Sequence, residues 1–531
     1  MTQDQKCTTT DDVQTRVTRR RFLEAVGAAT GAAALGIWPG SSSAGAPTVI
    51  KPTAELVVAF SVDPGHFDPR VEAGVPGFSM MYPHMYETIV WRRKDLALDP
   101  ALSLAEQWEQ VNPTTLRFKL RQGVNFHNGE EFTAEAVKLT AESFTAPESK
   151  FPVKSSMAVT REVKIVDKYT ADYLTEVPSR PLLRILGLQA MMSPRAMKEL
   201  GPKIATNPVG TGPYEFVEYV PGQHVLMEVN PHYWGPQPKS NRLKIRFIPE
   251  NGTRLAALES GEVMMVTNVP PDSIKRLEGN PQLEMRTSVT NRIMFVTLRT
   301  DRPPWTDKRA RQALNYAIDK EAITQGILGG LAPIAKAPLP PAVFGSHTGL
   351  QSYPYDPARA KELLAAAGAS GATFNLGVPN GRYLLDRQIG EAIAGYLSEA
   401  GLKVNFDNPT WSSFVTEISK FDQAKYDGYF FGWGVVTGEP DMLMREHFHS
   451  KFTRRNAYKN PEVDRLVDEA AESFDEAKVQ GTYVRAQEIV WDECPWIFLH
   501  LQPDLNAVNK RLRGFEARPD EWLILTEAHL V

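Results

Sequence analysis

From about residue 50 onward, short apolar runs alternate with longer amphipathic runs. Runs with strand character predict strands at 55–60, 116–120, 374–378, 403–406 and 429–433. Runs with an apolar period near 3.6 predict helices at 80–90, from 132 onward, and at 307–328, 356–367, 388–400 and 461–494. Thr133 and Asp356 stand at N-cap positions, and Pro357 suits the first turn after Asp356. This order of elements predicts an α/β protein of more than one domain.

The first 46 residues have the pattern of an export signal. Arg19 and Arg20 stand in the run T-R-R-R-F-L-E, which resembles the twin-arginine consensus. The following apolar stretch, 22–38, is rich in Ala and Gly and is too short to span a bilayer. Ala44 and Ala46 then form a small-x-small cleavage pattern. We expect a cleaved twin-arginine signal over residues 1–46; the alternative is a chance basic cluster before an Ala-rich helix.

Cysteine usage and composition narrow the class further. Cys7 precedes the apolar stretch and Cys494 is the second cysteine of the chain, so the exported part can form no internal disulfide. No cysteine stands at the cleavage point to carry a lipid. We therefore expect a soluble periplasmic protein, not lipid-anchored, that is stabilised by its core. The net charge of −4, with 23% charged residues, gives no indication of a nucleic acid or membrane partner.

Five segments resemble, in order, landmarks of the family 5 solute-binding proteins, which are the oligopeptide, dipeptide, nickel and glutathione receptors of ABC importers. They are LAEQWEQVNPTTLRFKLRQGVNFHNGEEFTAEAV at 104–137, NPVGTGPYEFVEYVPG at 207–222, NPHYWG at 230–235, PPWTDKRARQALNYAIDKEAI at 303–323 and NPEVDRLVDEA at 460–470. One match of this kind would be weak evidence of kinship. Five collinear matches cover the chain from about residue 50 to its C-terminus.

The resemblance implies a bilobed periplasmic binding-protein fold of type II, similar to cluster C, with an extra small domain. Lobe I would combine 47–87, 207–298 and 492–531; the extra domain II would be 88–206, and lobe III 299–491. Crossing segments near Leu298 and Trp491 would form the hinge. The Gly210-Thr-Gly212-Pro213 turn fits close approach of two backbone segments.

The function that the resemblance implies is transport rather than catalysis. A monomeric receptor would close on a small-molecule or peptide ligand and deliver it to an ABC permease and ATPase complex. Closure requires contacts from both lobes, because a ligand shifts an equilibrium only by its differential affinity for the two states.

The resemblance also places ligand contacts in the loop GWGVVTGEPD at 432–441. Trp433 would offer a flat apolar wall, with a core position as the alternative. In peptide-binding members, an acid three positions after this tryptophan pairs with the N-terminal amine of the peptide; here that position is Val436. We therefore expect poor binding of free α-amines unless Glu439 or Asp441 substitutes for the missing acid. The TGEPD sequence is similar to that of the glutathione-binding branch.

Arg382 falls where dipeptide-binding relatives place an arginine that holds the ligand carboxylate. The planar fork of a guanidinium suits bidentate binding of a carboxylate. The alternative is a solvated arginine on a loop beside Asp386. Tyr383, Trp411 and Phe78 are further cleft candidates, each with simple packing as its alternative.

Other chemistries find less support. His447 and His449 could present two imidazoles on one strand face, and His66, His84 and His127 are scattered upstream, but no metal-site spacing occurs. There is no Gly-x-Ser-x-Gly elbow or phosphate-binding loop. We expect no metal, no cofactor and no enzymatic activity. The alternatives are a secreted hydrolase with a bilobed cleft, a receptor for a metal chelate or oligosaccharide, and a chaperone-like peptide holder.

Overall fold

The computed structural model describes residues 55–531, apart from residues 72–73, 152 and 454. The predicted signal, with Arg19, Arg20, Ala44 and Ala46, lies outside the described residues and stays a sequence prediction. Within the described part of the chain, no helix is both long enough and apolar enough to cross a membrane.

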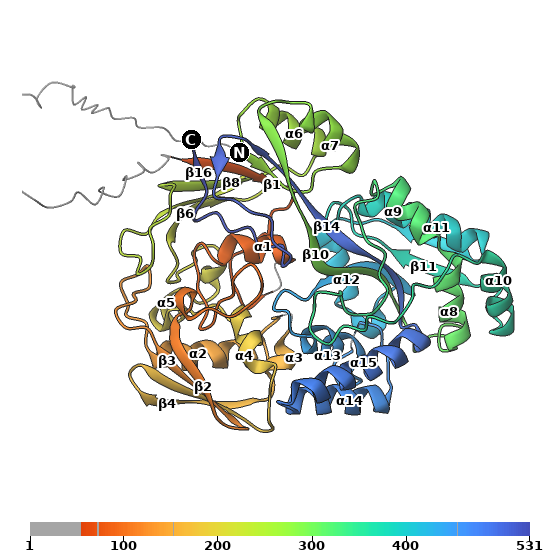
Figure 1. The fold of residues 1–531 in the computed structure, drawn as a ribbon, viewed down its shortest axis with the longest axis horizontal. Helices are drawn as coiled ribbons and strands as arrows, with labels where there is room; N and C mark the ends of the chain where they lie inside the picture. Colours follow the sequence, from red (N-terminus) through yellow and green to blue (C-terminus); the bar gives the residue numbers. More distant parts are fainter. Residues whose placement is uncertain (1–54, 72–73, 152, 454) are drawn as a thin grey trace, which may run out of the picture. The chain divides into compact units, whose positions relative to one another are not determined.

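A ten-stranded mixed sheet forms the frame of the described region (Figure 1). Its strand order is β12-β11-β13-β10-β14-β9-β1-β8-β7-β6. The bounds are β1 (Leu56–Phe60), β6 (Tyr214–Val220), β7 (His224–Val229), β8 (Arg242–Phe247), β9 (Met265–Val266), β10 (Leu283–Leu298), β11 (Thr373–Gly377), β12 (Lys403–Asp407), β13 (Gly428–Gly434) and β14 (Trp496–Asn509). Strand β1 is parallel to β8 and β9, and β11 is parallel to β12 and β13. The strands predicted from apolar runs are confirmed at β1, β11, β12 and β13.

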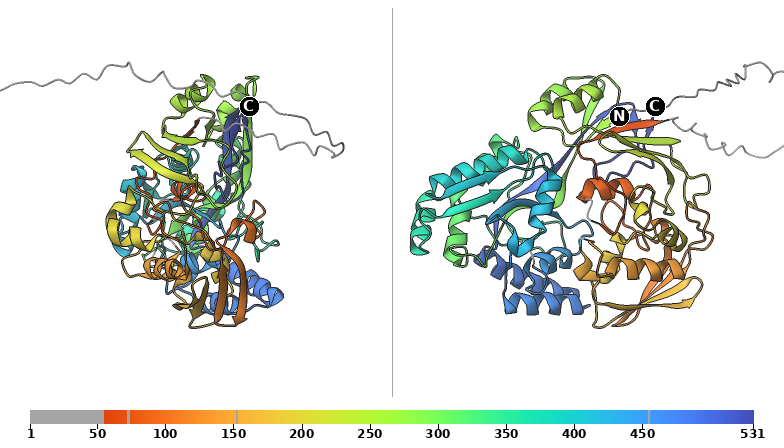
Figure 2. Two further views of the ribbon diagram at one scale, coloured as in Figure 1. Left: turned by 90° about the vertical axis from the view of Figure 1, so that its left-hand side faces the viewer. Right: turned by 180° about the vertical axis from the view of Figure 1, so that it is seen from behind.

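The two long strands β10 and β14 cross between the halves of this sheet (Figure 2). They pair antiparallel, and their register shifts between Val289 and Ile293. Strand β13 joins β10 only beyond this shift, whereas β9 joins the far end of β14. The chain positions expected to cross, Leu298 and Trp491, lie at the end of β10 and in the helix that leads into β14.

A second, four-stranded antiparallel sheet has the order β2-β3-β5-β4. Its strands are β2 (Ala105–Asn112), β3 (Thr115–Leu120), β4 (Thr160–Asp167) and β5 (Thr170–Thr175). Its own core contains Phe118, Phe126, Phe132 and Tyr173, which pack beside helix α2 (Ala134–Thr145). All of these elements fall inside 88–206, the segment proposed for the extra domain. A two-stranded sheet pairs β15 (Leu512–Arg513) with β16 (His529–Leu530).

Helices cover both halves of the large sheet. They are α1 (Gly74–Met81), α3 (Lys154–Met157), α4 (Leu182–Ile185), α5 (Pro194–Leu200), α6 (Asn251–Glu259), α7 (Pro271–Glu278), α8 (Lys308–Ala317), α9 (Lys320–Gly326), α10 (Pro357–Ala366), α11 (Asp386–Glu399), α12 (Trp411–Ile418), α13 (Asp441–Phe448), α14 (Pro461–Glu472) and α15 (Glu476–Glu493). Short 3-10 turns are η1 (Pro100–Leu102), η2 (Leu186–Leu188), η3 (Gly201–Ala205) and η4 (Phe421–Gln423). Asp356 caps α10, as predicted, because its carboxylate accepts the Arg359 N–H at 2.8 Å.

Three of the predicted helices are wrong in extent. The run 307–328 divides into α8 and α9, because Ile318 is extended and Asp319 caps a new helix by accepting the Ala322 N–H at 2.8 Å. The run 461–494 divides in the same way, where Asp475 caps α15. The helix predicted at 80–90 ends at Met81, and the proline at position 83 cannot supply the N–H that a continuing helix needs.

The predicted close approach at the glycine turn is confirmed. A Cβ atom on Gly210 would lie 2.1 Å from the Met85 carbonyl oxygen. One on Gly212 would lie 2.4 Å from the His84 carbonyl oxygen. Only glycine fits at either position, and the turn holds the segment before β6 against the chain that follows α1.

Candidate functional site

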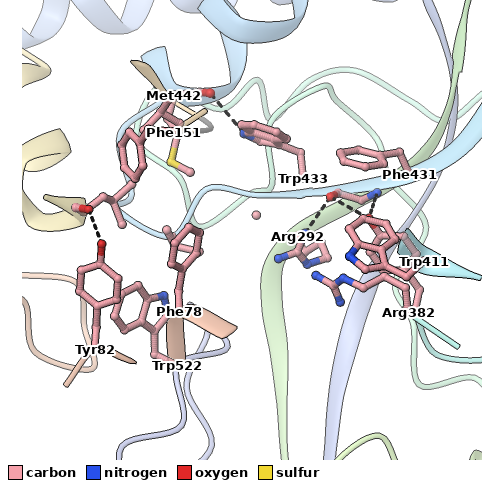
Figure 3. Close-up of a pocket in the computed structure, with 16 residues that line it drawn as sticks. Phe78, Tyr82, Phe151, Arg292, Arg382, Trp411, Phe431, Trp433, Met442 and Trp522 are labelled. Carbon is pink, nitrogen blue, oxygen red and sulfur yellow. Dashed lines mark hydrogen bonds between the residues drawn. The ribbon is translucent and has the colours of Figure 1, made fainter. Parts of the chain in front are cut away.

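A pocket opens beside the crossing strands, with about 660 Å³ of space inside it that no atom occupies, part of it continuous with solvent (Figure 3). Half of its lining residues are aromatic. The lining residues are Phe78, Tyr82, Phe151, Val153, Leu188, Arg292, Arg382, Tyr383, Trp411, Phe431, Gly432, Trp433, Gly434, Val436, Met442 and Trp522. Six residues predicted from the sequence meet here: Phe78, Arg382, Tyr383, Trp411, Trp433 and Val436.

The end of β13 builds one wall of the pocket through the sequence Gly432-Trp433-Gly434. A Cβ atom on Gly432 would lie 2.5 Å from the Met294 sulfur, and one on Gly434 would lie 2.9 Å from the Arg292 guanidinium. Glycine at both positions therefore lets side chains of β10 cross the strand. Trp433 lies between them and is held by its indole N–H, which donates to the Met442 carbonyl at 3.2 Å.

Arg382 lies in the loop between β11 and α11 and points toward the same pocket (Figure 3). Its guanidinium lies 4.6 Å from the ring centre of Tyr383 and 5.4 Å from that of Trp411. Only 5% of the residue is exposed, so it is not a solvated surface arginine. Cation–π contacts of this kind stabilise an arginine by about 0.5–2 kcal/mol.

Asp386 shapes this loop by accepting hydrogen bonds from its backbone. Its carboxylate accepts the backbone N–H groups of Gly381, Arg382 and Tyr383 at 3.1, 2.8 and 3.0 Å. Burial raises the pKa of Asp386, and the backbone donors oppose that shift. Asp386, in the first turn of α11, thus positions Arg382 by accepting a hydrogen bond from its backbone N–H.

Arg292 is a lining residue that the sequence prediction missed. Its Nε donates to both Glu521 carboxylate oxygens at 2.7 and 3.0 Å, and its Nη1 donates to the Gly432 carbonyl at 2.7 Å. The feature of the sequence that could have indicated it is an arginine directly before the mostly apolar run I-M-F-V-T-L in β10. A charged residue in a strand buried on both faces requires a partner or a ligand.

The facing wall is apolar, and most of it was also missed. It consists of Phe78 and Tyr82 from the N-terminal segment, Phe151, and Trp522 near the C-terminus. The Tyr82 hydroxyl donates to the Leu188 carbonyl at 2.9 Å and so has a protein partner. The Trp522 indole N–H is buried with no acceptor among the described residues.

Glu439 and Asp441 lie outside the described lining of the pocket. The two Glu439 oxygens each accept a hydrogen bond from Arg180 Nη1 at 2.9 Å. Asp441 accepts from Arg445 Nε at 2.9 Å and from the Ser156 hydroxyl at 3.0 Å. Both acids therefore contact residues of 88–206, the segment proposed for the extra domain. Burial raises the pKa of Glu439 to about 7, although Arg180 opposes this shift.

The two histidines do not share a strand face, and that expectation is wrong. His447 lies in α13 and His449 follows its end. The His447 ring lies 4.6 Å from Trp433 and 5.0 Å from Trp496 between ring centres, and burial lowers its pKa well below the usual value. His449 Nε2 instead lies 3.2 Å from Asp468. No group of three or more His, Cys, Asp or Glu side chains in the described region could hold a metal ion.

Residues 99–454 match the family described as bacterial extracellular solute-binding proteins, family 5. The chain belongs to this family. The glutathione-binding protein GsiB of Pectobacterium atrosepticum is 30% identical over 433 residues, which cover 78% of this chain and 83% of that protein.

Two solved structures show the same fold. The periplasmic binding protein DppA of Helicobacter pylori, in complex with the peptide STSA, superposes with a TM-score of 0.83 at 22% identity over 90% of this chain and 98% of that one. A dipeptide-binding protein of Pseudoalteromonas sp. SM9913, in complex with Met-Leu, gives a TM-score of 0.82 at 22% identity over 90% and 100%. The fold is thus the bilobed α/β architecture of periplasmic binding proteins.

Proposed function

We propose that this protein is the periplasmic substrate-binding component of an ABC importer and that it captures a peptide-like, carboxylate-bearing solute in the aromatic pocket. The observation that carries the proposal is the buried Arg382 guanidinium, placed in the lining by two aromatic rings. A guanidinium so oriented can bind a carboxylate with two parallel hydrogen bonds. The relative that binds glutathione and those solved with peptides support a ligand of this chemistry.

Val436 defines what the ligand lacks. It lines the pocket at the position where the resemblance predicts the amine-binding acid, and Glu439 and Asp441 face away toward Arg180 and Arg445. We therefore propose a solute whose amine is blocked, absent or distant from the carboxylate that Arg382 holds.

Native mass spectrometry of the purified protein and calorimetry test the ligand class. The probes are Met-Leu, N-acetyl-Met-Leu and glutathione. We expect stoichiometric binding of the acetylated peptide, weaker binding of Met-Leu, and recovery of every probe unchanged. Turnover of a probe would favour the hydrolase, and equal weak binding of all three would favour an unselective peptide holder.

The lobe boundaries given above, with β10 and β14 as crossing strands, predict closure on the ligand. Saturating N-acetyl-Met-Leu should reduce the radius of gyration in small-angle scattering. It should also stabilise the fold by about 3 kcal/mol at a hundredfold excess over the dissociation constant. Tight binding with an unchanged scattering curve would contradict closure.

We also propose export by the twin-arginine route, without a lipid anchor, and delivery as a monomer to a permease and ATPase complex. Changing Arg19 and Arg20 together to Lys should leave precursor in the cytoplasm, whereas the unaltered protein should yield a mature N-terminus at Pro47. N-terminal sequencing of periplasmic fractions measures both. Normal export of the double variant would contradict this route.

A further inference from the structure

The C-terminal segment Arg518–Trp522 carries two consecutive acids whose side chains serve different arginines. Asp520 is fully buried and accepts hydrogen bonds from Arg92 at 3.2 Å and from Arg518 at 2.9 Å. Glu521 instead receives two hydrogen bonds from Arg292, which lines the pocket. Asp520 thus balances the positive charges of Arg92 and Arg518 within the fold. Glu521 balances the positive charge of Arg292, which lies at the ligand site.

The backbone of Glu521 adopts an unusual conformation that directs this side chain. Its φ of 61° lies in the left-handed region, which non-glycine residues seldom occupy. Two contacts hold the segment: the Asn291 N–H donates to the Pro519 carbonyl at 2.7 Å, and the Ser79 hydroxyl donates to the Glu521 carbonyl at 3.3 Å. The turn directs Glu521 toward β10, and the next residue, Trp522, contributes to the apolar wall.

The ion pair between Glu521 and Arg292 is nearly sealed from solvent. The side chains are 11% and 4% exposed, respectively. Glu521 is not itself a lining residue, but its carboxylate offsets the charge of the Arg292 guanidinium and would repel a negative ligand group that approaches it in this poorly solvated site. Arg292 is therefore a poor anchor for a second anionic group while Glu521 is present.

We propose that Glu521 is a specificity-determining residue, which neutralises Arg292 and so disfavours solutes that bring a second carboxylate to Arg292. This inference rests on the proposed function, capture of a carboxylate-bearing solute through Arg382. It predicts that the protein binds dianionic solutes more weakly than monoanionic ones, a difference that a purely structural ion pair would not produce. Removing the charge of Glu521 should convert Arg292 into a second anion subsite.

Calorimetry with two isosteric probes measures this preference. N-acetyl-Met-Gln has one carboxylate and N-acetyl-Met-Glu has two. The unaltered protein should bind the dianion about tenfold more weakly than the monoanion. Glu521→Gln should abolish or reverse that difference. Glu516→Gln, which removes an exposed charge that pairs with Lys94 just before this segment, should leave it unchanged.

A second measurement separates this inference from the proposed function. Tryptophan fluorescence, titrated with sodium sulfate at constant ionic strength, should show saturable binding to Glu521→Gln. The unaltered protein and the double variant Arg292→Gln with Glu521→Gln, in which Arg382 is the remaining anion site, should bind sulfate more weakly. Should the unaltered protein bind neither peptide, the proposed function fails, and the sulfate titration still decides the role of Glu521.

The outcomes that overturn the inference are specific. One is equal affinity of the unaltered protein for the two peptides, a result that needs no variant to fold. The other is a folded Glu521→Gln protein, checked by its thermal melting, that neither gains affinity for the dianionic peptide nor binds sulfate more tightly than the unaltered protein.

Discussion

The two walls of the pocket differ in chemistry and in where their residues come from. One wall, the cationic wall, is formed by β10, β13 and the loop between β11 and α11, and it carries the guanidinium groups of Arg292 and Arg382. The other wall, the apolar wall, comes from the N-terminal segment, the 88–206 segment and the C-terminal segment, and it presents Phe78, Phe151 and Trp522 and no charge. The first wall can fix the orientation of a carboxylate, and the second can only select size and apolar character. A ligand must contact both to stabilise a closed state.

The largest effect should follow from removing the charge that orients the ligand. Arg382→Ala would leave the ligand carboxylate buried without its partner, which costs roughly 2–5 kcal/mol of binding free energy. Calorimetry with N-acetyl-Met-Leu measures it. Arg387→Ala, an exposed arginine on α11 paired with Glu391, is the matched control and should change the binding free energy by less than about 0.5 kcal/mol. If Arg382→Ala lost as little binding free energy as Arg387→Ala, Arg382 would have a packing role alone and would not bind the ligand carboxylate.

The apolar wall should show a smaller effect that depends on ligand size. Phe78→Ala removes apolar surface that a large side chain would bury, with a loss of about 2 kcal/mol for N-acetyl-Met-Leu. N-acetyl-Gly-Gly reaches less of that wall and should lose much less. An equal loss for both peptides would mean that Phe78 supports the fold of the pocket and does not contact the ligand side chain.

Sequence patterns predicted the cationic wall better than the apolar one. Trp433 and Arg382 stand in local motifs, so one segment of sequence suffices to find each of them. Arg292 and Trp522 form the site only because β10 and the C-terminal segment meet in three dimensions. Nothing near Trp522 in the sequence indicates that contact.

The two acids after Trp433 show the reverse error of local inference. Glu439 and Asp441 stand close to the missing amine-binding position in sequence, which made them candidates for its role. Their partners, Arg180 and Ser156, come from a segment far away in the chain, and these contacts direct both carboxylates away from the pocket. Similarly, the splits within 307–328 and 461–494 depend on single aspartate caps inside otherwise continuous amphipathic patterns.

The substitution Val436→Asp would place a carboxylate where the resemblance predicts the amine-binding acid. Val436→Asp should improve binding of Met-Leu by about 1.5 kcal/mol, through a charged hydrogen bond to its free amine. The same variant should weaken N-acetyl-Met-Leu, because the new carboxylate would lack a partner. Val436→Asn is the control of matched size without charge. Improvement of both peptides, or of neither, would remove Val436 as the reason that amines bind poorly.

The smallest effect on affinity is expected at Glu439, because it belongs to neither wall. Glu439→Gln should change the binding free energy of N-acetyl-Met-Leu by less than about 0.5 kcal/mol. Its effect should lie in the pH dependence of stability. Burial raises the pKa of Glu439 from 4.5 to about 7, so the folded state favours the protonated carboxyl. That contribution is complete below pH 4.5 and is lost as the pH rises through 7. Urea unfolding across this range should therefore show the unaltered protein losing stability relative to Glu439→Gln. Parallel pH profiles would contradict the raised pKa, and a large loss of affinity would return Glu439 to the ligand site.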